Sequence, residues 1–124
     1  MSFALTRSYS ESVQSGLLDF LNDLNLTCFA SEAAHEMEFE SMEEFHYAIK
    51  RAIEICVYSG ISVEANFRQV YICTDTGISY DWKLSLLGYR LVCLNGYCYN
   101  KNVAKLQMEL INSNLNSDSF CIFK

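Results

Sequence analysis

The chain of 124 residues has no proline and only five glycines. No proline interrupts its helical patterns and no low-complexity linker divides it, so we expect a single domain over residues 1–124. So few glycines leave no glycine-rich loop that could hold a phosphate group, and neither a nucleophile elbow nor an HExxH motif is present. The sequence therefore predicts a protein that is not an enzyme, and a small enzyme is the most distant alternative.

Long hydrophobic runs are missing as well. None approaches the roughly 20 residues that a membrane-spanning helix needs, and the first residues, MSFALTRSYSES, lack the apolar core of a secretory signal. These two absences predict a cytoplasmic protein without a membrane partner. Residues 1–10 are polar and aperiodic, and we expect them to form a flexible arm.

The six cysteines lack the secretory context in which an even number of them would indicate disulfides. Those at positions 28, 56, 73 and 93 lie in short apolar runs, so buried free thiols are the expected state. The closest pair, Cys93 and Cys98, has four residues between its members and no second pair to complete a zinc site. Neither His35 nor His46 has a recognisable partner for a nucleophilic cysteine. We therefore expect no metal and no cofactor.

Positive charge is scarce in the first half of the chain. Residues 1–64 hold eleven acidic residues against Arg7, Lys50 and Arg51. Such a field repels phosphates, which disfavours direct binding of nucleic acid. The excess is concentrated in six glutamates that no Lys or Arg interrupts: Glu32, Glu36, Glu38, Glu40, Glu43 and Glu44. They form either an ordinary solvated helix surface or a docking face for a basic protein partner, and the sequence predicts the docking face as the functional site.

The stretch from 41 to 60 has the clearest helical pattern. Apolar residues at positions 45, 48, 49, 52, 53 and 56 fall on one side of a 3.6-residue helix. Ser41 and Glu44 are spaced as a reciprocal capping box at its start, and Gly60 is typical of the residue that ends a helix. These signals predict one long helix with a single buried face.

The remaining pattern predicts a predominantly helical α+β fold with about five helices. Helical spacing marks residues 12–25, 31–40, 84–95 and 102–115, and a two-turn helix over 62–70, with Ser31, Ser62, Ser85 and Asn102 as caps. The side chains predicted to lie on the apolar faces are Val13, Leu17, Phe20, Leu21, Leu24, Ala34, Met37, Phe39, Val63, Phe67, Val70, Leu87, Leu91, Leu94, Val103, Leu106, Leu110 and Ile111. A small antiparallel two-stranded ribbon is expected at about 70–82, with Asp75-Thr76-Gly77 as its turn and Trp82 as its anchor. Residues 26–29 are a strand or a buried connector, and 120–123 add an edge strand or dock on the core.

Aromatic and basic residues alternate in the second half, which supports an alternative function. Rings can stack on unpaired bases while amines hold the phosphates, so this half could bind nucleic acid as an accessory module. The residues that would do so are Lys83, Arg90, Lys101, Lys105, Tyr97 and Tyr99. The alternative explanation is the core and rim of a compact domain.

Several ordered fragments resemble a known family: ASEAAHEMEFESMEEF, IKRAIEICVYSG, EANF, KLSLLGYRLVCLNG and VAKLQ. The matching residues are Cys56, Ser59, Gly60, Phe67, Leu84, Ser85, Asn95, Gly96, Val103, Ala104 and Gln107. Over roughly 29–111 the chain resembles the DNA-damage-inducible protein D family, which is related to the BRO-type amino-terminal domains of phage antirepressors. The resemblance implies a regulatory or inhibitory protein of phage or bacterial mobile-element type. An antirepressor, or an inhibitor of a host nucleic-acid machine that partly mimics nucleic acid, fits both charge and resemblance. A homodimer stays open.

Overall fold

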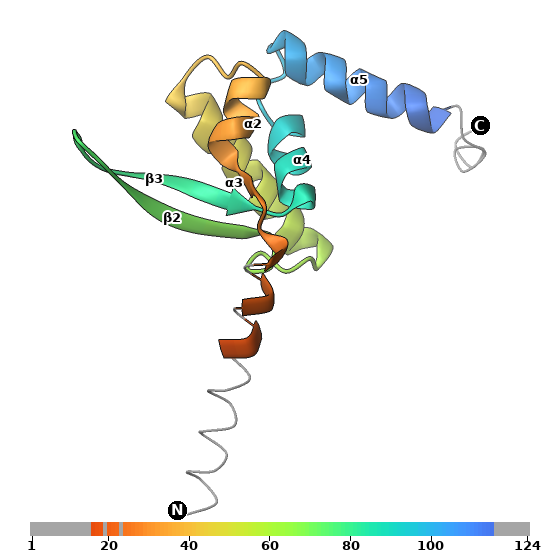
Figure 1. Cartoon of the computed structure of the whole chain (residues 1–124). Helices are drawn as coiled ribbons and strands as arrows, with labels where there is room; N and C mark the ends of the chain where they lie inside the picture. The colour runs from red at the N-terminus through yellow and green to blue at the C-terminus, as the bar shows by residue number, and fades with distance from the viewer. Residues whose placement is uncertain (1–15, 19, 23, 116–124) are drawn as a thin grey trace, which may run out of the picture.

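The computed structural model describes residues 16–18, 20–22 and 24–115 and has the expected predominantly helical α+β fold (Figure 1). The predicted arm over 1–10 and the apolar segment 120–123 lie outside the described residues. Residues 16–18, 20–22 and 24–25 are helical. The elements that follow are β1 (Cys28–Phe29), α2 (Ala30–Glu36), α3 (Met42–Ser59), β2 (Phe67–Thr74), β3 (Gly77–Leu84), α4 (Leu86–Leu94) and α5 (Lys101–Leu115).

The sheet has three antiparallel strands in the order β1-β3-β2, so the prediction of two strands was wrong. The added strand is short, because β1 pairs only Cys28 with Leu84 and Phe29 with Lys83 before α2 begins. The predicted helix over 62–70 was also wrong, since β2 begins at Phe67 and pairs along its length with β3. Its sequence, FRQVYICT, is rich in the β-branched and aromatic residues that suit a strand, and strand pairing prevailed over helical spacing.

The hairpin of β2 and β3 projects away from the helices (Figure 1). Its predicted turn is confirmed, because Thr74 pairs with Gly77 and leaves Asp75 and Thr76 as a two-residue loop. All side chains from 71 to 80 are exposed, while Trp82 is half-buried and packs against the core. The base of the hairpin is therefore anchored in the domain and its tip is not.

The long helix α3 forms as predicted and supplies one side of the core. Phe45, Ala48, Ile49, Ala52 and Cys56 are buried on one face. At its start the Ser41 hydroxyl accepts the backbone N–H of Glu44, and at its end Gly60 adopts a left-handed conformation with φ of 73°. The Ser41 cap at the start of the helix and the glycine at its end are thus confirmed.

In α4 the predicted buried stripe was displaced by one residue. Gly88, Val92 and Cys93 are buried, whereas Leu87 is 44% exposed and the predicted Leu91 and Leu94 are half-buried. A Cβ atom at Gly88 would lie 2.7 Å from the carbonyl oxygen of Asn66, so only a glycine lets the helix approach the chain before β2 this closely. That approach determines which face of α4 points inward. Ser85 caps the helix as predicted by accepting the N–H of Gly88.

Helix α5 leaves the domain at an angle, so most of its apolar side chains do not reach the core (Figure 1). Val103 is buried and Leu106 half-buried, but Leu110 and Ile111 are exposed, contrary to expectation. The predicted inward side chains of the first helical segment, Leu17, Phe20, Leu21 and Leu24, are also more than half exposed. The cap of α5 is Asn100 and not Asn102, because the Asn100 side-chain oxygen accepts the N–H groups of Asn102 and Val103. No helix in the described ranges combines the length and the apolar character that crossing a membrane requires.

Candidate protein-docking site

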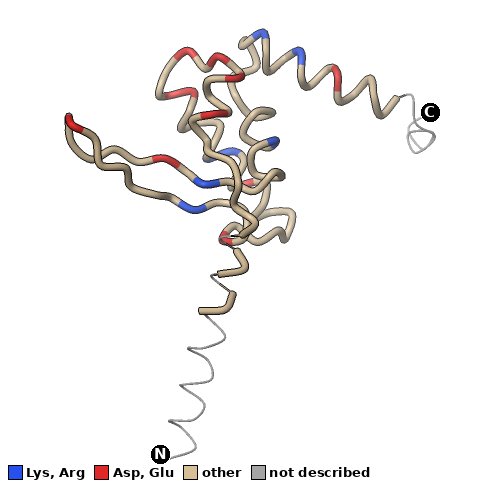
Figure 2. The backbone as a smooth tube through the Cα atoms, viewed as in Figure 1, with Lys and Arg blue, Asp and Glu red and all other residues tan. Residues whose placement is uncertain are grey.

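The predicted glutamates gather where α2 meets α3 (Figure 2). We call the five of them that reach the surface the acidic corner: Glu32, Glu36, Glu38, Glu40 and Glu43. The side-chain partners that the structure gives these five carboxylates are the neutral groups of Tyr89 and Asn102. Their negative charge is therefore left uncompensated at the surface.

Two members of the acidic corner are held in place by neutral donors. The Tyr89 hydroxyl on α4 donates to the Glu36 carboxylate, and the Asn102 side-chain amide on α5 donates to the Glu38 carboxylate at 3.1 Å. Burial raises the pKa of Tyr89, and the hydrogen bond to Glu36 raises it further, so the hydroxyl stays protonated and remains a donor. These bonds fix the carboxylates without neutralising them.

The sixth glutamate, Glu44, is not part of the docking face, and its prediction as a surface residue was wrong. It is 1% exposed. Its carboxylate accepts the backbone N–H of Glu40 at 2.8 Å, the backbone N–H of Tyr97 at 2.9 Å and the side-chain amide of Asn100 at 3.1 Å. The reciprocal half of the predicted capping box is thus replaced, because Glu44 takes the N–H of Glu40 and not that of Ser41. Glu44 ties the α2–α3 turn, which carries the acidic corner, to the α4–α5 loop.

The residues of the nucleic-acid alternative do not gather on one element. Lys83 lies on β3, Arg90 on α4, and Lys101 and Lys105 on α5, so the four cations are spread over the molecule (Figure 2). Only the two aromatic members come together, because the rings of Tyr97 and Tyr99 are 5.1 Å apart.

Tyr97 and Tyr99 extend into an aromatic row that the sequence did not reveal. The ring of Tyr47, on α3, lies 5.0 Å from that of Tyr97, and the Arg51 guanidinium lies 5.7 Å from the centre of the Tyr47 ring. The Glu44 carboxylate accepts the backbone N–H groups of both Glu40 and Tyr97, so the aromatic row adjoins the acidic corner. Tyr47 follows Glu43 by one helical turn, and that spacing was the signal that could have identified it.

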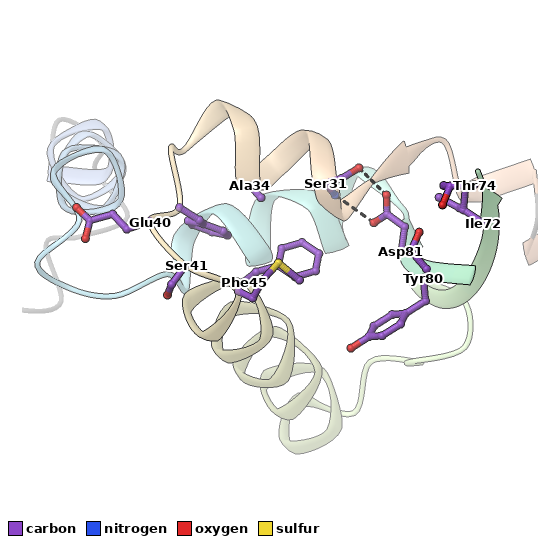
Figure 3. Close-up of a pocket in the computed structure, with 12 residues that line it drawn as sticks. Ser31, Ala34, Glu40, Ser41, Phe45, Ile72, Thr74, Tyr80 and Asp81 are labelled. Carbon is purple, nitrogen blue, oxygen red and sulfur yellow. Dashed lines mark hydrogen bonds between the residues drawn. The ribbon is translucent and has the colours of Figure 1, made fainter. Parts of the chain in front are cut away.

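A groove of about 660 Å³ separates the α2–α3 corner from the hairpin (Figure 3). Apolar side chains of the helices form one wall: Ala34, Phe39, Met42 and Phe45. The hairpin contributes the other wall, with Ile72, Thr74, Ser79, Tyr80 and Asp81. The two walls come from segments about 40 residues apart in the sequence, which is why no local pattern indicated this groove.

Asp81 joins the hairpin wall of the groove to the first turn of α2. It is buried, and its carboxylate accepts the backbone N–H of Ser31 at 3.1 Å, the Ser31 hydroxyl, and the backbone N–H of Trp82 at 2.7 Å. The predicted cap Ser31 was wrong, because the residue at the cap position is Phe29, whose side chain makes no capping bond. A carboxylate from β3 therefore accepts a backbone N–H group in the first turn of α2, as the side chain of a local capping residue does in other helices.

Replacing Asp81 with alanine is expected to lower the free energy of unfolding by about 2 kcal/mol, because two backbone N–H groups and one hydroxyl lose their acceptor. Chemical denaturation followed by circular dichroism measures the loss. The control is Asp75→Ala in the exposed turn, where the change should stay within about 0.5 kcal/mol. Equal losses in the two variants would contradict the capping role.

The cysteines in the described part of the chain are not paired in disulfides. Cys28, Cys56, Cys73, Cys93 and Cys98 are free thiols. Cys56 and Cys93 are buried as predicted, but Cys28 is only half-buried, and the prediction was wrong for Cys73, which is exposed because its strand lies beyond the helices. Burial raises the pKa of Cys56, and burial together with the charge of Glu36 raises that of Cys93 to about 11, so these two thiols stay protonated at neutral pH. In the described part of the chain no three His, Cys, Asp or Glu residues form a group that could hold a metal ion.

Comparison of the chain with protein-family models, with curated proteins and with solved structures found no match. The resemblance over roughly 29–111 therefore stays a prediction.

Proposed function

We propose that this chain is a noncatalytic regulatory protein that binds a basic partner protein through the acidic corner. The observation that supports this is the group of five exposed carboxylates where α2 meets α3, whose side-chain partners in the structure are the neutral groups of Tyr89 and Asn102. A docking face of this kind attracts a positively charged partner over long range and selects against acidic ones. The ring of Tyr99 lies beside the acidic corner and is 69% exposed, so a cationic side chain of the partner can stack on it.

The kind of partner follows from the charge and from the resemblance together. Proteins that bind nucleic acid present Lys and Arg to phosphates, and a rigid set of carboxylates can occupy the same cations. The proposed role is therefore that of an antirepressor, or of an inhibitor of a host nucleic-acid machine, in a phage or bacterial mobile element. The hydrogen bonds to Glu36 and Glu38 support this role because they keep carboxylates fixed before the partner arrives.

The test is the triple variant Glu32→Lys, Glu40→Lys and Glu43→Lys, with a fluorescent oligo-arginine peptide as the probe. We expect the affinity measured by fluorescence anisotropy to fall about 30-fold, since each reversal at an exposed rim position costs somewhat under 1 kcal/mol. The thermal midpoint should stay nearly unchanged because all three side chains are exposed.

The matched control reverses three exposed acidic residues elsewhere, with Glu64→Lys, Asp75→Lys and Glu109→Lys. This variant has the same net charge as the first and should retain most of its affinity. If the two triple variants lose affinity equally, net charge and not the acidic corner determines binding, and the proposed docking face is wrong.

A second candidate function is an accessory module that binds single-stranded nucleic acid, and the stacked pair Tyr97 and Tyr99 favours it. A labelled single-stranded oligonucleotide distinguishes the two functions. Affinity that falls steeply with salt, and that Lys101→Glu with Lys105→Glu abolishes, would establish the second function and displace the first.

A further inference from the structure

The outer edge of β3 is paired along only a small part of its length. On that side β1 covers Leu84 and Lys83, and then the chain turns into α2. Within residues 24–115, no strand continues β1 along the stretch of β3 from Gly77 to Trp82. Because the first turn of α2 lies beside Asp81, the part of this edge that could pair with a further strand is the stretch from Gly77 to Tyr80.

The pairing register identifies the backbone groups that face this open edge. Because a two-residue loop joins β2 and β3, Thr74 and Gly77 form a hydrogen-bonded pair, and such pairs alternate along the hairpin. Ser79 and Asp81 then bond to β2, while Ile78 and Tyr80 direct their N–H and C=O groups outward. The same alternation turns the N–H of Trp82 outward, where the Asp81 carboxylate accepts it.

The open edge of β3 borders the groove described above, which gives an added strand a place to lie. Ser79, Tyr80 and Asp81 line the groove, and α2 and α3 form the opposite wall (Figure 3). Phe39, Met42 and Phe45 make that wall apolar, so alternate side chains of an added strand could be buried against it. Ile72 and Thr74 of β2 also line the groove, but they are paired with Ser79 and Gly77, so they contribute the face of the hairpin and not a free edge beside β3.

Charge indicates which kind of segment fits the groove. Its acidic residues are Glu40 and Asp81, and no Lys or Arg is among the described residues that line it. Glu40 lies at the end of the groove formed by the α2–α3 turn and belongs to the acidic corner; its carboxylate is directed away from Phe45 and the hairpin, so its charge lies just beyond the groove (Figure 3). An acidic segment is thus disfavoured, and a segment that alternates apolar with basic residues matches both the apolar wall and the charged end.

We infer that the groove binds an extended basic segment of the partner protein as an additional strand on the outer edge of β3. This inference rests on the proposed function, because it specifies how the partner of the acidic corner is held. Backbone hydrogen bonds to Ile78 and Tyr80 supply the pairing, the apolar wall receives alternate side chains, and the acidic corner receives the cations that follow along the segment.

The test follows amide hydrogen exchange by NMR, with a peptide of alternating valine and lysine as the probe. On binding, the outward N–H groups of Ile78 and Tyr80 should become protected, while those of Ser79 and Asp81, which already bond to β2, should change little. This measurement uses the unmodified protein. Binding of the peptide without protection of Ile78 and Tyr80 would overturn the inference.

A matched pair of variants tests the same edge independently. Cys73 lies directly opposite Ile78 in a pair that is not hydrogen-bonded, so a proline at either position removes an outward N–H without breaking a bond between β2 and β3. Ile78→Pro should weaken binding of the valine–lysine peptide about tenfold, which is the loss expected for edge hydrogen bonds. Cys73→Pro alters the opposite edge and should leave binding unchanged. Equal binding by the two variants would count against the added strand.

The oligo-arginine peptide separates this inference from the proposed function. If it binds as tightly as the valine–lysine peptide and is indifferent to Ile78→Pro, the acidic corner binds cations but no strand is added, and only the inference is wrong. If neither peptide binds, the proposed function and the inference both fail.

Discussion

Replacing Glu44 with alanine is expected to lower the free energy of unfolding by about 4 kcal/mol. The carboxylate is buried, and its loss leaves the N–H groups of Glu40 and Tyr97 and the side-chain amide of Asn100 without an acceptor. Each orphaned buried donor costs about 1–3 kcal/mol, and the remaining cavity is polar enough for water to offset part of the total. Urea denaturation monitored by tryptophan fluorescence measures the loss at Trp82.

The neighbouring Glu43 gives the control, since it is exposed and belongs to the acidic corner. Glu43→Ala should change stability by no more than about 0.5 kcal/mol. Conversely, Glu43→Lys should weaken partner binding while the protein stays folded. A loss below 1 kcal/mol for Glu44→Ala would mean that the three donors find other acceptors, and that Glu44 does not hold the α2–α3 turn in place.

The ends of α3 and the start of α4 could be predicted because their causes are local. Ser41 and Ser85 accept N–H groups three residues ahead in the chain, and Gly60 adopts its left-handed conformation within one turn of the helix it ends. The turn at Asp75 and Thr76 is local as well. Features of this kind depend on neighbours in the sequence, so spacing and residue type were sufficient to find them.

The features that sequence patterns missed depend on contacts between distant segments. Asp81 caps a helix that begins 50 residues before it, and Asn100 reaches Glu44 across 56 residues. Residues 67–70 have helical spacing, yet β3 was available to pair with them. Neither the groove nor the open edge of β3 has a local signal, because each arises only when the hairpin and the α2–α3 corner come together.

The burial of Glu44 agrees with its helical phase along α3 and not with its place in the run of six glutamates. It lies one helical turn before Ala48 and two before Ala52, both fully buried, so its phase along α3 already placed it on the inner face. The run of six glutamates suggested one continuous charged surface. Helical phase was the better guide here, and it divides the run into five residues that can meet a partner and one that holds the turn beneath them.

Several residues that carry the family resemblance have structural roles in this fold. Ser85 caps α4, and the Gln107 side-chain amide donates to the carbonyl oxygen of Leu94 at 2.7 Å, near the end of the same helix. A Cβ atom at Gly96 would lie 2.7 Å from Phe39 and Val103. These residues keep α4, α5 and the α2–α3 turn together, so they serve the scaffold, whereas no glutamate of the acidic corner is among the individual matching residues.

Leu84→Ala is expected to lower the free energy of unfolding by about 3 kcal/mol. Leu84 is fully buried and pairs with both Cys28 on β1 and Phe67 on β2, so its side chain lies where all three strands meet the helices. Truncating a buried leucine to alanine typically costs about 2–5 kcal/mol, and the site cannot readily collapse because the backbone on both sides is held in the sheet.

Leu86 is the matched control for this substitution, since it lies two residues away and is 53% exposed. Leu86→Ala should cost less than about 1 kcal/mol in the same denaturation experiment, because little apolar area leaves the core.

The difference in stability between the two variants also bears on the groove. The open edge of β3 can bind a partner only if the other end of the strand is firmly anchored, and Leu84 is the anchor. Equal losses at the two positions would place the anchor elsewhere and leave the open edge without the rigid support that binding a strand requires.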